Sequence, residues 1–334
     1  MDKNKGIKIL VTGGAGFIGS HLTDYLLEQG YSVTVIDNLS NGSLDRLDHA
    51  KTFDNFTFIH GDILAKEDCA LAVKGCKMIY HLACLGVRHS LHSPFENHRV
   101  NAEGTLIVLE AARMEGIDHF FYISTSEIYG RTSVFPITER APTCPLTVYG
   151  SSKLVGEHYS HNYRECFGLS TTVLRIFNNY GPRAHYEGDA GEIIPRSIVK
   201  ILNHDQPVVY GDGSITRDFF FVKDTVKVLS DLLSIRHYLN GETINVGTGN
   251  EVSMKFLLEK LLSLMNESDL GIHYLADRPA DVPRLWVDNT KLKRLGIVLP
   301  TDYFDKNLLE TIGYYREISK TKNLIDSVKI TNWN

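Results

Sequence analysis

The sequence lacks a long hydrophobic run, an excess of basic residues and any low-complexity tract. Its 35 Lys and Arg residues are outnumbered by 40 Asp and Glu residues, so no basic surplus exists to bind nucleic acid. The N-terminus runs into a short apolar stretch, without the ~7–15-residue apolar region of a signal peptide or the ~18 apolar residues of a membrane span. We therefore expect a soluble, cytoplasmic protein that binds neither nucleic acid nor a membrane.

Cysteine is also scarce. The five cysteines are scattered along the chain, and none has the C-x-x-C spacing of a metal or redox site. The 14 histidines form neither an H-x-x-x-H pair nor a cluster with cysteine. We expect reduced thiols and no metal site.

What the sequence does have is a regular alternation of strand-length apolar stretches and longer helical segments up to about residue 180, which is typical of a parallel sheet. We predict a Rossmann-type doubly wound parallel sheet over residues 1–180, with some later segments crossing back. Residues 181–334 are expected to form a smaller mixed α/β lobe. The predicted strands are 7–12, 32–37, 56–60, 78–82, 119–124 and 169–177, and the predicted helices are 16–29, 94–114 and 148–167.

A glycine-rich loop follows the first predicted strand and opens the first predicted helix. At such a junction glycine lets a pyrophosphate approach the free N–H groups and the positive end of the helix dipole. The loop therefore predicts a dinucleotide site, whose residues would be Gly13, Gly16, Phe17, Ile18 and Gly19.

Asp37 strengthens this prediction because it ends the second predicted strand, 18 residues after Gly19. A carboxylate at that place can accept hydrogen bonds from both hydroxyls of an adenosine ribose. It would also repel a 2′-phosphate, and no Arg or Lys occurs in residues 38–43. We therefore expect NAD rather than NADP as the cofactor.

Tyr149 and Lys153 stand four residues apart, so on a helix both side chains project from one face. A nearby cation is expected to lower the pKa of the phenol. The tyrosinate could then remove a proton from a sugar hydroxyl while hydride leaves for the nicotinamide. Tyrosine and lysine at this spacing are common on any amphipathic helix, so the pair gains its meaning from the cofactor motifs around it.

With these motifs the sequence resembles the extended short-chain dehydrogenase/reductase family, specifically its nucleotide-sugar epimerases, dehydratases and decarboxylases. The resemblance covers nearly the whole chain. Further matching segments are Gly61-Asp62-Ile63, His81-Leu82-Ala83, Asn101, the Ser124–Gly130 run, the Phe177–Arg183 run, Gly211-Asp212-Gly213, the Thr216–Phe219 run and the Arg278–Val282 run.

The resemblance implies an NAD-dependent enzyme that acts on a nucleoside-diphosphate sugar, bound mainly by the second lobe, and it implies a homodimer. Thr125 would hydrogen-bond the sugar O4, and Lys153 would also hold the nicotinamide ribose. The other implied cofactor contacts are Asp62, Ile63, Leu82, Ala83 and Asn101. The implied substrate contacts are Arg88, Ser126, Asn178, Arg217 and Arg278.

Glu127 bears on the reaction that follows oxidation at C4. The C4 ketone makes the C5 proton acidic, so a carboxylate nearby can open elimination across C5 and C6. Members of the family that resemble this chain and carry Glu here are 4,6-dehydratases and decarboxylases. Ser126 departs from the Asp of dTDP-glucose dehydratases, and Asp37 departs from the NADP preference of GDP-mannose dehydratases. We predict a 4,6-dehydratase-like lyase.

Three alternatives stay open. A 4-epimerase acting on UDP-glucose or UDP-N-acetylglucosamine needs no further acid or base, so Glu127 would then be a structural carboxylate. A UDP-glucuronate decarboxylase is disfavoured by the three carboxylates of the loop at residues 184–192, which would lie near an anionic sugar. A catalytically silent NAD-binding regulator is disfavoured because Tyr149, Lys153 and Thr125 are all present.

Overall fold

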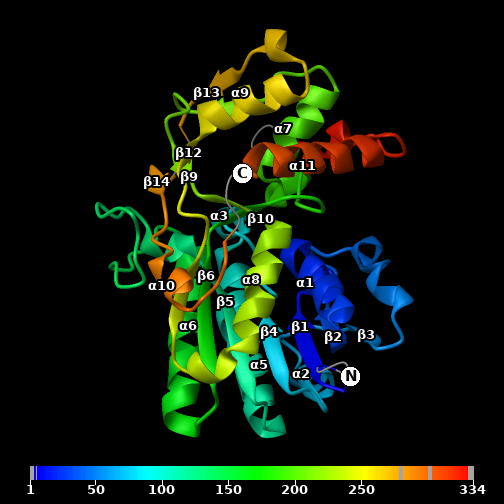
Figure 1. The fold of residues 1–334 in the computed structure, drawn as a ribbon, viewed down its shortest axis with the longest axis vertical. Coiled ribbons are helices and arrows are strands. Elements are labelled where there is room, and N and C mark those ends of the chain that lie inside the picture. The colour runs from blue at the N-terminus through cyan, green and yellow to red at the C-terminus, as the bar shows by residue number, and fades with distance from the viewer. Residues whose placement is uncertain (1–3, 5, 278–280, 300–302, 330–334) are drawn as a thin grey trace.

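Seven parallel strands form the central sheet of the computed structural model, which describes residues 4, 6–277, 281–299 and 303–329 (Figure 1). Their order is β11-β6-β5-β4-β1-β2-β3, and every neighbouring pair is parallel. This is the predicted Rossmann-type arrangement. The bounds are β1 (Lys8–Thr12), β2 (Ser32–Asp37), β3 (Phe56–His60), β4 (Met78–His81), β5 (His119–Thr125), β6 (Thr171–Ile176) and β11 (Thr243–Val246).

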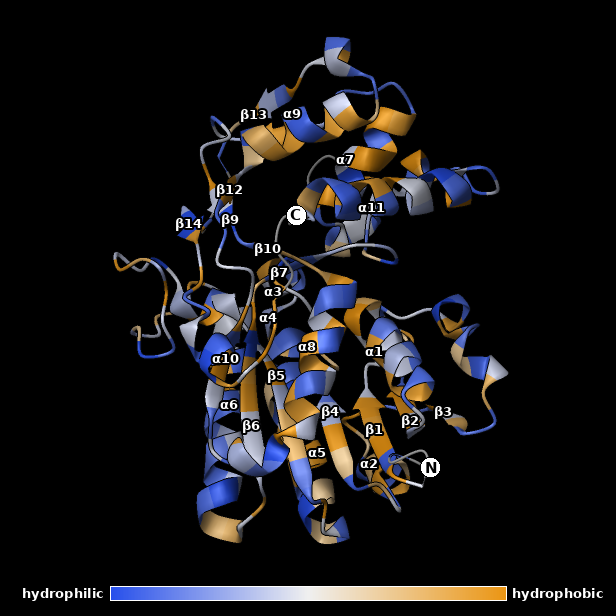
Figure 2. Cartoon of the chain, in the orientation of Figure 1, coloured by the Kyte–Doolittle hydropathy of each residue, from blue (hydrophilic) through white to orange (hydrophobic). Residues whose placement is uncertain are grey.

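Helices cover both faces of the sheet because successive strand residues point to opposite sides. In β1, Ile9 and Val11 pack into one apolar cluster with α1 and α8, whereas Leu10 packs into another with α2, α5 and α6. Figure 2 shows the strands as mostly hydrophobic between these layers. The bounds are α1 (Phe17–Glu28), α2 (Lys66–Val73), α5 (Gly104–Glu115), α6 (Val148–Phe167) and α8 (Val222–Ser234).

The predicted strands and helices agree with these elements within two residues at each end, with one exception. The helix predicted over residues 94–114 consists of three contiguous pieces, α4 (Pro94–His98), the π-helical turn η3 (Arg99–Glu103) and α5. The hydrophobic period does not distinguish a π turn from the α-helix around it, and such turns are frequent at functional sites.

A third apolar cluster lies beyond the carboxyl edge of the sheet and is built by α7 (Ile193–Leu202), α9 (Met254–Leu264) and α11 (Phe304–Ser319). α8 and β11 lie between α7 and α9 in sequence but belong to the first lobe, where α8 packs beside the sheet and β11 is its edge strand (Figure 1). We propose that the boundary between the two lobes lies near residue 180. The remaining helices and strands are α3 (His89–His92), α10 (Thr290–Arg294), β7 (Asn178–Tyr180), β8 (Val208–Tyr210), β9 (Thr216–Arg217), β10 (Phe219–Phe221), β12 (Val252–Ser253), β13 (His273–Leu275) and β14 (Arg284–Leu285).

The strand order reverses between β1 and β4, which are neighbours in the sheet although β2 and β3 separate them in sequence. In doubly wound sheets, the loops that leave two such strands diverge and open a crevice at their carboxyl ends. The fold therefore places the glycine-rich loop after β1 and the Leu82-Ala83 segment after β4 on either side of one crevice.

Candidate active site

A cavity of about 1210 Å³ lies between the carboxyl edge of the sheet and the second lobe. Its walls come from the loops after β1, β2, β4 and β5, from the start of α6, and from α7, β8 and β9 of the second lobe. With the exception of Asn101, every predicted site residue within the described part of the chain lines this cavity. Arg278 lies outside the described residues, and its role stays a prediction.

The cofactor end of the cavity is formed by the glycine-rich loop. Gly13 has a φ of +69°, and a Cβ there would lie 2.8 Å from the backbone of Ala83, so only glycine fits without strain. A Cβ at Gly19 would overlap the carbonyl oxygen of Gly13. The loop is a close-packed cradle for a phosphate group at the start of α1. The predicted contacts Gly16, Phe17 and Ile18 also line it, as do Asp62, Ile63, Leu82 and Ala83.

Asp37 lies at the end of β2 with its side chain held in place by two backbone amides. Ala15 N donates to Oδ2 at 2.9 Å, and Leu39 N donates to Oδ1 at 2.8 Å. Burial raises the pKa of this carboxyl, and the two amide bonds oppose that rise. The carboxylate lines the cavity and keeps further acceptor capacity, as a ribose diol requires.

Asn101 differs from the other predicted cofactor contacts because it does not line the cavity. It is almost fully buried in the π turn η3, where its Oδ1 accepts from Leu85 N at 2.8 Å and its Nδ2 donates to Leu85 O at 2.9 Å. This paired contact fixes the loop that carries Leu82 and Ala83. The geometry shows Asn101 supporting the cavity wall from behind.

Thr125, Glu127 and Tyr149 meet on one wall of the cavity. Thr125 ends β5 and caps the 3₁₀ helix η4 (Ser126–Tyr129), whose Glu127 N donates to Thr125 Oγ1 at 3.2 Å. Tyr149 lies in the first turn of α6, hydrogen-bonded to Thr125 and close enough to Glu127 for the two to interact electrostatically. Ser126 is buried beside them and also lines the cavity.

The expected lowering of the Tyr149 pKa is not what the structure shows. Burial raises the pKa of Tyr149 well above its usual value, the negative charge of Glu127 adds to the rise, and the hydrogen bond with Thr125 offsets only part of it. The phenol is therefore protonated at neutral pH in the protein alone. Positive charge from Lys153 is not among the strongest influences on this group.

Lys153 is 2% exposed and lines the cavity one helical turn after Tyr149. Its Nζ lies 4.4 Å from the centre of the Tyr122 ring, an arrangement in which the ring face attracts the ammonium group. Burial lowers the pKa of Lys153. The amine is thus held at the sheet side of the cavity.

The substrate end of the cavity contains two paired arginines. Arg88 Nη1 lies 3.2 Å from Glu192 Oε1, and Arg217 Nη2 lies 2.7 Å from Asp281 Oδ1. Arg217 is 7% exposed and also donates to the carbonyl of Val282 at 2.7 Å. Both arginines therefore form ion pairs on the cavity wall, and the Arg217–Asp281 pair is the more buried of the two.

Asn178, at the start of β7, also lines this end of the cavity. Its Oδ1 is buried and has no hydrogen-bond partner among the described residues. A buried acceptor without a partner is costly, which suits a position where a ligand donates the missing bond.

Within the described ranges, no group of three or more His, Cys, Asp or Glu side chains could hold a metal ion. None of the helices seen there is long and apolar enough to cross a membrane.

A doubly wound sheet with a glycine-rich loop after β1, an Asp at the end of β2 and a Tyr/Lys pair at the start of α6 defines an extended short-chain dehydrogenase/reductase. The comparison with family models is more specific. The chain belongs to the GDP-mannose 4,6-dehydratase family, whose model matches residues 10–296.

Three relatives of this chain have three different names. A putative UDP-glucose 4-epimerase of Methanocaldococcus jannaschii is 35% identical over 86% of this chain and 92% of its own. A UDP-N-acetyl-α-D-glucosaminuronate decarboxylase of Bacillus cytotoxicus is 32% identical over 93% and 98%. The structure of a dTDP-glucose 4,6-dehydratase of Streptomyces venezuelae with NAD bound is similar with a TM-score of 0.87, 29% identity and coverage of 93% and 97%. The chain is thus related to NAD-dependent nucleotide-sugar enzymes, with its own activity left open.

Two features of the site are not among those expected from the sequence. The pairing of Arg88 with Glu192 has no local pattern, because the two residues are far apart in the chain. Glu157 and Arg175, which lie behind the cavity wall, are the second feature. Arg175 is the single charged residue of an otherwise uncharged strand, and Glu157 follows Lys153 by four residues on α6, so both had a signal in the sequence.

Proposed function

We propose that this protein is an NAD-dependent, 4,6-dehydratase-like lyase that acts on a nucleoside-diphosphate hexose through a 4-keto sugar. The observation that carries the proposal is the position of Glu127, whose side chain shares one cavity wall with Thr125 and Tyr149. A carboxylate beside the base would be placed to reach the carbon next to the one being oxidised.

The proposed cofactor is NAD. The cradle formed by Gly13 and Gly19 fits a pyrophosphate, and the fixed carboxylate of Asp37 fits the adenosine ribose. When bound, NAD would supply a hydride acceptor for C4 of the sugar and, in its reduced form, a hydride donor for C6. Lys153 would hold the nicotinamide ribose from the sheet side of the cavity.

The protein's own residues account for the proton movements. Tyr149 is protonated in the protein alone, so it must lose its proton before it can act as the base. As tyrosinate it would then take the O4 proton while Thr125 holds O4, and the C4 ketone would form. Glu127 then takes the acidified C5 proton, a C5–C6 double bond forms and the C6–O bond breaks. One of the two protons leaves with the hydroxide as water. As the hydride adds to C6, the other proton returns to C5, so the net change is loss of water.

A 4-epimerase is the second candidate, and the name of the Methanocaldococcus jannaschii relative supports it. In that reaction the 4-keto sugar turns in the cavity and receives the hydride on its other face, so Glu127 has no chemical step. The size of the cavity is compatible with such a rotation, and the two functions differ in whether the product has lost mass.

Decarboxylation of a uronate has less support. An anionic C6 group needs a cation, but Arg88 and Arg217 are each already paired with a carboxylate of the cavity wall. Glu127, Glu187 and Asp189 add further negative charge to the same cavity. These carboxylates favour a neutral hexose or N-acetylhexosamine.

Product mass separates the candidates. We expect purified protein, incubated in turn with UDP-glucose, UDP-N-acetylglucosamine, UDP-glucuronate, dTDP-glucose and GDP-mannose, to remove water from one neutral sugar. Loss of carbon dioxide or an unchanged mass with an altered C4 would favour the rival activities.

The variant Glu127→Gln tests the role of this carboxylate in the elimination. Its control is Glu259→Gln, on the exposed face of α9. The Glu127→Gln protein is expected to reduce NAD but to form dehydrated product at least about 100-fold more slowly than the parent. Full turnover by this variant would remove Glu127 from the reaction.

We also propose a homodimer formed through α5 and α6. Both helices expose large apolar side chains near their C-terminal ends, with Met114 71% and Phe167 56% exposed. Where exposed apolar side chains form a contiguous patch, the patch marks an interaction surface. A monomer in sedimentation equilibrium at working concentration would reject this proposal.

A further inference from the structure

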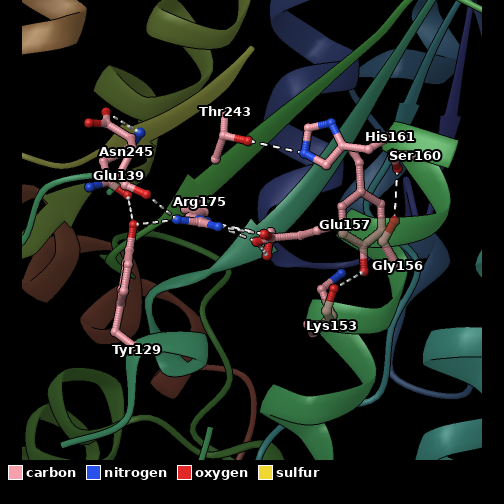
Figure 3. Close-up of polar contacts among 12 residues, drawn as sticks. Tyr129, Glu139, Lys153, Gly156, Glu157, Ser160, His161, Arg175, Thr243 and Asn245 are labelled. Carbon is pink, nitrogen blue, oxygen red and sulfur yellow. Dashed lines mark hydrogen bonds and ion pairs between the residues drawn. The ribbon is translucent and has the colours of Figure 1, made fainter. Parts of the chain in front are cut away.

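A buried ion pair lies behind the cavity wall, between Arg175 on β6 and Glu157 on α6 (Figure 3). Arg175 Nε donates to Glu157 Oε1 at 3.0 Å, and its Nη2 donates to Oε2 at 2.7 Å. The side chains are 9% and 3% exposed. This forked geometry is specific to arginine and fixes the relative position of the helix and the strand.

Glu157 connects the pair to the elements that carry Lys153 and Thr125. It lies one helical turn after Lys153 on α6, and its Oε1 accepts a hydrogen bond from Ser124 Oγ at 2.5 Å. Ser124 is the residue before Thr125 on β5. The carboxylate therefore sets the distance between the Tyr149 helix and the strand end that holds Thr125.

Arg175 connects the pair to the turn that carries Glu127. Its Nη1 donates to Tyr129 Oη at 2.8 Å and to the carbonyl of Glu139 at 3.1 Å. Tyr129 belongs to η4, the same turn as Glu127, and its hydroxyl donates to Asn245 Oδ1 at 2.7 Å. One guanidinium group thus holds α6, η4 and, through Asn245, β11.

Stability alone is a weak reason for such a pair. Removing two charges from water costs several kcal/mol, and replacing a buried pair with apolar side chains of similar volume is often neutral or stabilising. What an apolar replacement would not supply is the set of directed bonds to Ser124, Tyr129 and Glu139. The arrangement therefore points to a need for precise placement.

We propose that Arg175 and Glu157 are positioning residues that set the spacing between Tyr149 and Lys153 on α6 and Thr125 and Glu127 on β5 and η4. The inference rests on the proposed function, because it assigns these four residues to one reaction. Neither Arg175 nor Glu157 lines the cavity, so both act through the residues that they hold.

The first test is Glu157→Gln, which keeps the size of the side chain but removes its charge. Its control is Asp231→Asn, which removes the charge of an exposed ion pair on α8. The rate of NAD reduction is measured in a single turnover, with saturating NAD and the sugar that the parent accepts. We expect this rate to fall by about 10- to 100-fold in Glu157→Gln, because misplacement of catalytic groups by about 1 Å has such an effect. The affinities for NAD and sugar should stay near those of the parent.

The second test is Tyr129→Phe, which removes one hydroxyl from the Arg175 network and leaves Glu157 untouched. Because this variant affects only the side of the network that holds η4, NAD reduction should stay within about threefold of the parent. The later elimination should slow by about tenfold, so reduced nicotinamide should accumulate during turnover. Arg175→Lys keeps the charge but loses the forked pair of hydrogen bonds, so it should slow both NAD reduction and elimination. This variant replaces Glu157→Gln in the test if Glu157→Gln is too unstable to purify.

The outcomes separate the two proposals. If the parent reduces NAD and Glu157→Gln and Arg175→Lys do so at the same rate, the positioning role is wrong. If their activity falls only in proportion to the folded fraction, the pair is structural and the inference is also overturned. If the parent reduces NAD with none of the sugars, the proposed function fails and the inference falls with it.

Discussion

Two arginine–glutamate pairs, one on the cavity wall and one behind it, differ in how firmly they are held. Arg175–Glu157 lies within the first lobe, is under a tenth exposed and is bonded to β5, to η4 and to the turn at Glu139. Arg88–Glu192 joins the loop after β4 to the residue before α7, and Glu192 is 46% exposed. The first pair is suited to fixing geometry, while the second can exchange its partner for a ligand.

The loop around Glu192 has other contacts of the same exchangeable kind. His92 Nε2 lies 2.7 Å from Asp189, and Arg46 lies 3.6 Å from Glu187, so side chains of the first lobe meet this loop at three places. Partly exposed pairs contribute little stability because solvent screens them. We infer that the chemistry is carried by the rigid lobe and the choice of sugar by the loop at residues 184–192.

The largest effect is expected from Tyr149→Phe, which removes the proposed base from the rigid side. The rate of NAD reduction by the accepted sugar should fall by about 10³-fold, since a positioned general base contributes about 10²- to 10⁴-fold. NAD affinity should change little, because the phosphate cradle and Asp37 are untouched. Stopped-flow measurement of nicotinamide reduction and a separate NAD titration check both points. Unchanged activity in every assay would favour the silent regulator instead.

The next effect concerns acid stability of the rigid lobe, which contains three buried histidines. Burial lowers the pKa of His21, His81 and His119 to about 3, with the positive charge of Arg183 adding to the effect at His21. In the unfolded chain their pKa is about 6.5, so the unfolded state takes up protons first as the pH falls. Stability is therefore lost as the pH drops from 6.5 toward 3.

The expected loss is about 1 kcal/mol for each of these histidines between about pH 6.5 and 5.5. Urea unfolding at both pH values measures it. His119→Gln should lose less stability on acidification than the parent, whereas His204→Gln, whose side chain is 77% exposed, should behave as the parent does. Equal losses in all three proteins would show that other groups control acid unfolding.

The difference between local patterns and contacts that form only in the folded chain explains what the sequence could predict. The strands, the glycine loop, Asp37 and the exact span of α6 follow from local patterns, because hydrophobic period and glycine spacing are properties of neighbouring residues. The partners of Arg88 and Arg175 could not be predicted, since Glu192 and Tyr129 reach them only through the folded topology. The spacing of Tyr149 and Lys153 indicates a low pKa for the phenol. Burial, which the spacing does not reveal, raises that pKa instead.

The smallest of these effects is expected from Glu192→Gln, which tests the exchangeable pair. Without the carboxylate, the Arg88 guanidinium can pair with an anionic group at C6 of the sugar. The affinity for UDP-glucuronate should rise by about tenfold relative to UDP-glucose, which corresponds to one charge-assisted hydrogen bond. Competition of each nucleotide sugar against the accepted substrate measures the ratio.

Glu187→Gln is the matched control, because it removes a carboxylate from the same loop and the same cavity wall without touching Arg88. If only Glu192→Gln gains affinity for the uronate, the gain comes from the released guanidinium. If both variants gain equally, general negative charge repels the uronate, and Arg88 has no specific part. A gain in neither would mean that Arg88 stays fixed without Glu192, and the distinction between a rigid pair and an exchangeable pair would fail.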